Sequence, residues 1–280
     1  MTERSDLPHT SSFTTPDGDL AYRDQGTGPA LVLLHGGFLD HTQWEPQIRA
    51  FAPHWRVIAP DVRGHGGSAN ATRPFRATDD LAALLRHLGV GPAVVAGVSM
   101  GGGIAVDTAL EHPGLVRAVV VSGVGTSEPV FEDAWSLEVL AAQQRALVAG
   151  DVAGWLDAFQ RFTAGPHRRL TDVDADVLGR VRGAALRTVS KHTADEPDHR
   201  VPVGDTWKRA TEIDVPVLAI NGALDSPDHL AMAERLVHGV RDGRVATVPD
   251  SAHYPNLENP DAFDGHLAEF LRNLPPLGPS

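Results

Sequence analysis

The chain has 280 residues, of which 42% are hydrophobic and none is cysteine, and its formal net charge is −12. This length and apolar content suffice for one large core, or for a core that carries an insertion. The acidic charge argues against nucleic acid and anionic membranes as partners, because both would repel the chain. Without cysteine, disulfides, thiolate metal sites and a cysteine nucleophile are excluded.

The first residues and the hydropathy of the chain indicate its cellular location. No run of about 18 apolar residues occurs that could span a bilayer. The polar stretch Met1–Asp6 lacks the apolar segment of a secretory signal. We therefore expect a cytoplasmic protein, either a monomer or a homodimer.

Apolar runs alternate with helical periodicity along most of the chain, which predicts an α/β fold with a mostly parallel sheet between two layers of helices. Fully apolar runs such as Leu31–Leu34 indicate strands buried on both faces. The turn at Thr14–Asp19 predicts antiparallel N-terminal strands. The expected strands are Leu20–Arg23, Ala30–Leu34, Arg56–Ala59, Ala93–Ala96, Ala118–Ser122, Val217–Asn221 and Arg244–Val248.

Helical patterns fill the intervals between these strands. At the start of one of them, Thr78 is expected to cap the helix, and Asp79 and Asp80 place negative charge at its positive end. The expected core helices are Gln43–Phe51, Thr78–Leu88, Met100–Glu111, His229–Val237 and Pro260–Leu271.

The alternation of strand and helix patterns is interrupted between about Thr126 and Ala210. Helical patterns follow one another there, at Trp135–Ala149, Val152–Thr163 and Val173–Val189. We interpret residues 126–210 as a helical cap inserted into a core formed by residues 1–125 and 211–280. Because ligands bind at the carboxyl ends of parallel strands, such a cap would cover the site.

The most informative motif is Gly97-Val98-Ser99-Met100-Gly101, between an expected strand and an expected helix. A sharp turn there would strain the backbone of Ser99, and side chains at positions 97 and 101 would clash. The hydroxyl would lie beside a helix N-terminus, which favours developing negative charge. The motif predicts a nucleophilic serine, with a plain glycine-rich turn as the alternative.

A serine nucleophile needs a base, and the base needs a third group that orients it. Asp225 and His253 each follow an expected strand, so both fall on the same edge of the sheet as Ser99. The order serine, acid, histidine matches one known arrangement of this triad. Asp228 and Glu128 remain alternatives for the acid.

An oxyanion must also meet preorganised donors. His35-Gly36-Gly37-Phe38 directly follows an expected strand, and the backbone N–H groups of Gly37 and Met100 would supply two such donors. His35 is expected to hold this loop rather than to act in catalysis. We interpret Asp61–Ser68 as a loop whose residues have structural roles. We interpret Lys191–His199 as a solvated loop, in preference to a metal site.

These ordered motifs resemble those of the α/β-hydrolase family over essentially the whole chain. The resemblance implies an eight-stranded, mostly parallel sheet with a cap, and it implies Ser99 as nucleophile, His253 as base and Asp225 as orienting acid, without a metal or an organic cofactor. Serine at position 99 argues against the haloalkane dehalogenase and epoxide hydrolase branches, because those have aspartate there. The motifs concerned are His35-Gly36-Gly37, Asp61–Ser68, Gly97–Gly101, Asp225 and His253.

The activity implied is hydrolysis of a carboxylic ester or lactone of a small, largely apolar substrate through an acyl-enzyme on Ser99. The same triad in this family also serves carbon–carbon bond and enol-lactone hydrolysis, peptide cleavage, acyl transfer and peracid formation, and no residue here discriminates among them. A ligand-binding receptor or pseudoenzyme is a further alternative.

Aromatic residues are the candidates for contacting the substrate. Phe38 and Met100 adjoin the expected oxyanion donors and the nucleophile. The aromatic candidates in the expected cap are Phe131, Trp135, Trp155, Phe159 and Phe162. The helical spacing of Trp155, Phe159 and Phe162 also fits packing of the cap against the core.

Overall fold

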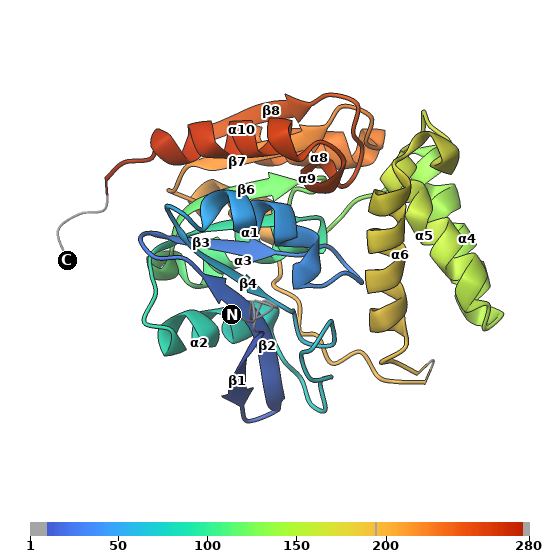
Figure 1. Ribbon diagram of the computed structural model, residues 1–280, viewed down its shortest axis with the longest axis horizontal. Helices are drawn as coiled ribbons and strands as arrows, with labels where there is room; N and C mark the ends of the chain where they lie inside the picture. Colours follow the sequence, from blue (N-terminus) through green and yellow to red (C-terminus); the bar gives the residue numbers. More distant parts are fainter. Residues whose placement is uncertain (1–9, 194, 277–280) are drawn as a thin grey trace, which may run out of the picture.

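The computed structural model describes residues 10–193 and 195–276. An eight-stranded sheet passes through the core, and helices cover both of its faces (Figure 1). This confirms the expected fold class. The strands are β1 (Ser11–Thr15), β2 (Gly18–Gln25), β3 (Ala30–Leu34), β4 (Arg56–Pro60), β5 (Ala93–Val98), β6 (Val116–Ser122), β7 (Val217–Gly222) and β8 (Gly243–Val248).

The strand order is β1-β2-β4-β3-β5-β6-β7-β8. β2 is antiparallel to both β1 and β4, and every other pairing is parallel. The antiparallel N-terminal strands expected at the Thr14–Asp19 turn are β1 and β2. The sequence gives no bounds for β1, because Phe13 is its one apolar residue. The parallel strands β3 to β8 all end on one edge of the sheet, which is where ligands bind in folds of this kind.

Alternate residues of the central strands face opposite helical layers, as strand geometry requires. Leu31 and Leu33 belong to the apolar core beneath α1 and α10, whereas Val32 and Leu34 belong to the core beneath α2 and α3. The helices are α1 (Glu45–Phe51), α2 (Ala77–His87), α3 (Met100–Glu111), α4 (Ala134–Val148), α5 (Val152–Ala164), α6 (Ala175–Val189), α7 (Thr206–Arg209), α8 (Pro227–Gly239), α9 (Pro255–Glu258) and α10 (Pro260–Arg272).

Each strand and helix expected from the sequence is present, with bounds within two residues of the prediction. Among the described residues, no helix is both long enough and apolar enough to cross a bilayer.

The three helices expected between residues 126 and 210 stand together beside one end of the sheet, as α4, α5 and α6 (Figure 1). Each begins at an aspartate whose side chain accepts backbone N–H groups of the first turn: Asp133, Asp151 and Asp174. Such caps satisfy donors that a helix start leaves without partners. The sequence therefore encodes these helix starts locally.

The expected cap of α2 is wrong. The helix begins at Ala77, so Thr78 lies inside its first turn, and Arg76 occupies the cap position without a side-chain cap bond. The reason is tertiary: Phe75 donates its N–H to the carbonyl of His199 and accepts the N–H of Val201. This pairing holds the chain extended up to the residue before the helix.

The described residues of the segment Lys191–His199 are exposed or half-buried, as expected for a solvated loop, but its first two residues bond to the core. The Nζ of Lys191 donates to the carbonyls of Gly66 (2.9 Å) and Ser68, and the His192 ring lies 2.9 Å from the carbonyl of Gly64. Ala194 lies outside the described residues. These bonds join the end of α6 to the Asp61–Ser68 loop.

Candidate active site

Ser99 occupies the turn between β5 and α3. Its φ is 52° and its ψ is −119°, a conformation that residues other than glycine rarely adopt. A Cβ at Gly97 would run into the backbone of Gly101, and one at Gly101 would run into the carbonyl of Leu34. Close packing of β5, α3 and β3 therefore forces the turn, and Ser99 lines a cavity of about 490 Å³.

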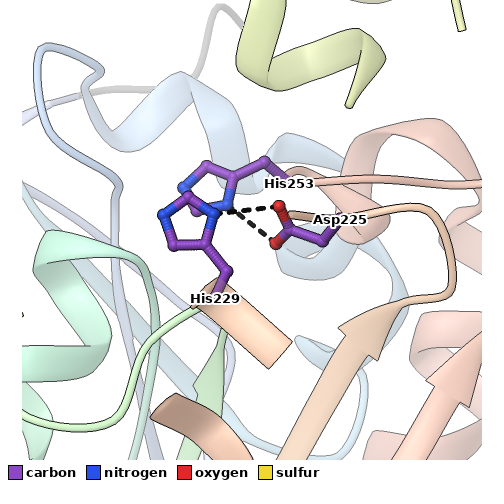
Figure 2. A group of neighbouring side chains, drawn as sticks. All are labelled: Asp225, His229 and His253. Atoms are coloured by element: carbon purple, nitrogen blue, oxygen red, sulfur yellow. Dashed lines mark hydrogen bonds and ion pairs between the residues drawn. The ribbon is translucent and has the colours of Figure 1, made fainter. Parts of the chain in front are cut away.

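Asp225 and His253 meet at the ends of β7 and β8. The Nδ1–H of His253 donates to Oδ2 of Asp225 over 2.9 Å, and each residue is 3% exposed (Figure 2). Because an ionised carboxylate only accepts, the proton lies on Nδ1 and the lone pair on Nε2. This is the tautomer that a base acting on a serine hydroxyl requires.

The alternative acids have other partners. Asp228 accepts the N–H groups of Glu132 and Asp133, and the carboxylate of Glu128 accepts the N–H and hydroxyl of Thr206. Both carboxylates anchor the segments that lead into and out of the 126–210 region. Of the three candidate acids, the structure places Asp225 against His253.

Gly123 connects the serine turn with this pair. The N–H of Ser99 donates to the carbonyl of Ser122 over 2.8 Å. The next residue, Gly123, has a φ of 63°, and a Cβ there would lie 2.7 Å from ring atoms of His253. Any other residue at position 123 would displace the imidazole, so this glycine sets the approach of β6 to the histidine.

A second histidine, which is not among the residues predicted for the site, contacts Asp225. His229, in the first turn of α8, places Nδ1 3.0 Å from Oδ1 of Asp225 and 3.0 Å from Oγ of Ser226. Its ring stacks on that of His253 with centroids 4.1 Å apart, and in Figure 2 the two rings lie over one another beside the carboxylate. His229 also lines the cavity. Its position four residues after Asp225, at a helix start, is the sequence signal that indicates a contact with the acid.

Burial and the neighbouring charges shift the pKa values of Asp225 and His253 in opposing directions. Burial raises the pKa of the Asp225 carboxyl, but the charges of His253 and His229 and their hydrogen bonds outweigh it and hold that pKa well below its usual range. Burial lowers the pKa of His253, Asp225 raises it and His229 lowers it, and the net result is a pKa below the ordinary value. His253 is therefore neutral near pH 7, with Nε2 free to accept a proton.

The predicted oxyanion donors are neighbours. A Cβ at Gly37 would lie 3.8 Å from that of Met100, and Met100 opens α3, where the first N–H groups have no acceptor within the helix. His35 is fully buried; its Nδ1–H donates to the carbonyl of Gly36, and its Nε2 accepts the N–H of Val62. Both ring nitrogens thus hold the loop, as the sequence predicts.

The Asp61–Ser68 motif is likewise held by local bonds. The carboxylate of Asp61 accepts the N–H groups of His41 (2.7 Å) and Gly67 (2.8 Å), while the guanidinium of Arg63 pairs with Asp80 at 2.7 Å. These contacts agree with the interpretation of the motif as loop architecture.

Most of the aromatic residues predicted to contact substrate lie outside the lining of the Ser99 cavity. Trp155 stacks on Phe159, and Phe38 meets the edges of both rings. Trp135 packs against Phe162. The helical spacing thus reflects packing of α5 against the loop after β3. Of the expected lining residues, Phe131 and Met100 do line the cavity, and Phe75 adds an aromatic side chain that the sequence did not indicate.

Comparison with known proteins agrees with this geometry. Residues 29–260 match the family described as alpha/beta hydrolase fold. A pimeloyl-acyl-carrier-protein methyl ester esterase from Aromatoleum aromaticum is 34% identical, over 83% of this chain and 94% of that protein. A 2-(acetamidomethylene)succinate hydrolase from Mesorhizobium japonicum is 29% identical, over 90% of this chain and 91% of that protein.

Among solved structures, the enol-lactonase from Burkholderia xenovorans has a TM-score of 0.75 at 24% identity, covering 94% of this chain and 100% of that one. This likeness shows the shared fold. The family match covers most of the chain, and the esterase relative is similar over nearly its full length. This chain therefore belongs to the α/β-hydrolase family of enzymes.

Proposed function

We propose that this enzyme hydrolyses a carboxylic ester or lactone of a small, largely apolar substrate, with Ser99 as nucleophile, His253 as base and Asp225 as orienting acid. The observation that carries the proposal is the strained Ser99 turn on a cavity, beside a buried, hydrogen-bonded Asp225–His253 pair. The esterase relative supports ester chemistry in particular, because its name specifies a methyl ester.

The proposed mechanism has two halves. The Nε2 of His253 takes the proton of the Ser99 hydroxyl as its oxygen attacks the carbonyl carbon, and the oxyanion is held by the N–H groups of Gly37 and Met100. His253 then returns the proton to the leaving alcohol, which leaves an acyl-enzyme. Water, deprotonated by His253, attacks this ester and releases the acid, and Ser99 regains its proton.

The segment 126–210 is the proposed cap. Trp155 of α5 contacts Phe38, the neighbour of a proposed oxyanion donor, with ring centroids 4.6 Å apart. Arg168, after α5, donates to Glu258 over 2.5 Å and to the carbonyl of Asp250 over 3.1 Å, close to His253 in the chain. The segment therefore contacts the loops that carry both halves of the site, which supports a role in covering it.

Labelling with a fluorophosphonate tests the proposal. The probe forms a bond with an activated serine, and we expect one adduct per chain, located on Ser99 by peptide mass spectrometry. Multiple turnovers on simple aryl esters and lactones are expected in the same preparation. No adduct on Ser99, or ligand binding that raises the melting temperature with a single slow turnover, would contradict the enzyme proposal and favour a receptor.

We also propose that His229 positions Asp225 and lowers the proton affinity of His253. Its Nδ1–H occupies the carboxylate oxygen that His253 does not use, and a positive charge on its ring would lie against the His253 imidazole. The other rings that pack on it, those of Phe131 and Phe162, carry no charge. Within the part of the chain that the structure describes, Asp225 and His253 are the ionisable groups that bond to its ring or stack on it.

The pH profile of kcat/KM tests this role. Since the active form of His253 is neutral and its pKa is lowered, the acid limb is expected to have its midpoint below pH 6.5. His229→Phe removes one cause of the lowering and is expected to move that midpoint to higher pH. His238→Gln, at an exposed position near the end of α8, serves as the control. A midpoint that stays in place in His229→Phe would refute the positioning role.

A further inference from the structure

The peptide group that carries one proposed oxyanion donor is held through its carbonyl. The N–H of Gly37 belongs to the same planar peptide group as the carbonyl oxygen of Gly36. That oxygen accepts the Nδ1–H of His35 over 2.8 Å and the N–H of Leu39 over 3.1 Å. Because a trans peptide group directs its N–H opposite to its C=O, these two bonds set the direction of the Gly37 N–H.

The side chain of Gln43 holds the preceding peptide group. It is 4% exposed, and its Oε1 accepts the N–H of Gly36 over 2.8 Å. Glycine has the freest backbone of all residues, so Gly36 by itself does not fix the path of this loop. Since the peptide groups on both sides of Gly36 are bonded, a change in its φ or ψ would break a hydrogen bond.

The other end of the Gln43 side chain bonds to the segment after the proposed base. Its Nε2 donates to Oδ1 of Asn256 over 3.3 Å, and Nδ2 of Asn256 donates to the main-chain carbonyl of Gln43 over 3.2 Å. Asn256 lies in α9, three residues after His253, and is fully buried. The two amides therefore join the loop of the oxyanion donor to the loop of the base.

Main-chain groups determine how these amides are oriented. The N–H of Gly36 only donates, so Gln43 must present its oxygen, and the carbonyl of Gln43 only accepts, so Asn256 must present its nitrogen. Gln47 of α1, also fully buried, accepts from Nδ2 of Asn256 over 3.3 Å and donates to the carbonyl of Asn256 over 3.1 Å. One arrangement of the three amides satisfies every bond, and such a buried network is rigid.

We propose that Gln43 and Asn256 are positioning residues, which hold the Gly37 N–H in place relative to the His253 imidazole. Neither side chain is among the described residues that line the Ser99 cavity, so both act through the two loops. A donor fixed in advance stabilises the oxyanion without rearrangement during the reaction. The inference rests on the proposed function, which assigns the donor and the base.

Gln43→Met tests the inference, because methionine has a similar length but neither accepts strongly from Gly36 nor donates to Asn256. We expect kcat for a 4-nitrophenyl ester to fall by about tenfold to a hundredfold, with KM changed by less than about threefold. Rates are measured well below the melting temperature of the variant. A purely structural role would lower that temperature and leave kcat of the folded protein unchanged.

A trifluoromethyl ketone measures the oxyanion site directly. Its carbonyl carbon forms a tetrahedral adduct with an activated serine, and the oxygen of the adduct corresponds to the oxyanion of the reaction. The inhibition constant is expected to rise in Gln43→Met by about the factor by which kcat/KM falls. A fall in kcat/KM without weaker binding of the ketone would contradict the inference.

Gln43→Glu is the conservative variant. A protonated carboxyl group reproduces both bonds, because its carbonyl oxygen accepts the N–H of Gly36 and its O–H donates to Asn256, whereas a carboxylate only accepts. Burial favours the protonated form. We expect kcat close to that of the parent at the acidic end of the activity profile and a falling ratio to the parent as the pH rises. The same loss as in Gln43→Met at every pH would overturn the inference.

A double-mutant cycle tests whether the two residues act together. Asn256→Leu leaves the N–H of Gly36 bonded but frees the Gln43 side chain, so we expect a smaller loss of kcat, about threefold to tenfold. The double variant is expected to lose at most about twofold more than Gln43→Met, since both changes break one network. Losses that multiply would show independent effects and overturn the inference. Should Gln43→Met fail to fold, Asn256→Leu and the ketone carry the test.

Gln160→Met is the matched control. Gln160 of α5 is 6% exposed, and its Nε2 donates to the carbonyl of Leu178 over 2.9 Å, so this variant also loses a buried amide. It is expected to keep the parental kcat and the parental affinity for the ketone. An equal loss of kcat in this control would show general loosening of the fold and would overturn the inference.

The outcomes for this inference and for the proposed function are distinct. If the fluorophosphonate labels Ser99 and esters turn over, but Gln43→Met keeps the parental kcat, the inference is wrong and the proposed function stands. Failure of Ser99 labelling in the parent overturns the proposed function itself.

Discussion

Replacement of Ser99 by alanine is expected to lower kcat/KM for a 4-nitrophenyl ester by about 10⁴- to 10⁶-fold. The physical reason is that no acyl-enzyme forms without the hydroxyl, so the oxyanion donors and the cavity alone supply the residual rate. Initial rates at matched protein concentration measure the effect. Melting temperature is recorded alongside, because the strained φ of 52° is costly for serine and also for alanine, so the fold should persist in the variant.

Ser190→Ala is the matched control. Its hydroxyl donates to the carbonyl of Leu186 just beyond the end of α6, and the side chain is exposed. This variant is expected to keep the parental rate and the parental fluorophosphonate adduct. A Ser99→Ala protein that hydrolyses the ester at nearly the parental rate would show that another group is the nucleophile.

Replacement of Asp225 by asparagine is expected to lower kcat by about 10³- to 10⁴-fold. The carboxylate holds the proton of His253 on Nδ1 and stabilises the imidazolium that forms during acylation. An amide removes the negative charge, and when it turns its NH₂ group toward His253 it favours the tautomer that carries its proton on Nε2. Burial of both residues makes the loss of charge more costly than it would be at the surface.

Asp228→Asn and Glu128→Gln are the controls for this assignment. Each keeps a carbonyl oxygen to accept the backbone N–H groups that the carboxylate accepts in the parent. Both are expected to retain activity close to that of the parent. A large loss in either, with Asp225→Asn nearly unaffected, would transfer the role of the acid to that residue.

Treatment with a chelator tests whether the side chains around Asp225 hold a metal ion. Asp225, His229 and His253 form the one group of the described residues whose ligand atoms lie close enough together to hold a metal ion. In the proposed mechanism the Nδ1 atoms of both rings instead donate to the carboxylate. Activity is therefore expected to survive dialysis against EDTA, and a loss restored by added zinc would contradict the triad.

The elements and the triad candidates are predictable because their signals are local. The apolar run Leu31–Leu34 indicates a doubly buried strand wherever it stands in the chain, and the structure buries it completely. The glycines at positions 97 and 101 identify the sharp turn because a Cβ at either position would clash with the backbone. Asp225 and His253 were found because the ends of parallel strands share one edge, so chain order alone brings them together.

Periodicity and turn chemistry act over a few residues, so they predict the α/β architecture and the residue types at the strand ends. Which side chains face the cavity depends on contacts between distant parts of the chain. Thr78 is an orphaned hydroxyl rather than a cap, since the chain near residue 200 pairs with Phe75. The approach of Gly123 to the His253 ring likewise depends on the distance between segments far apart in the chain, which local patterns do not encode.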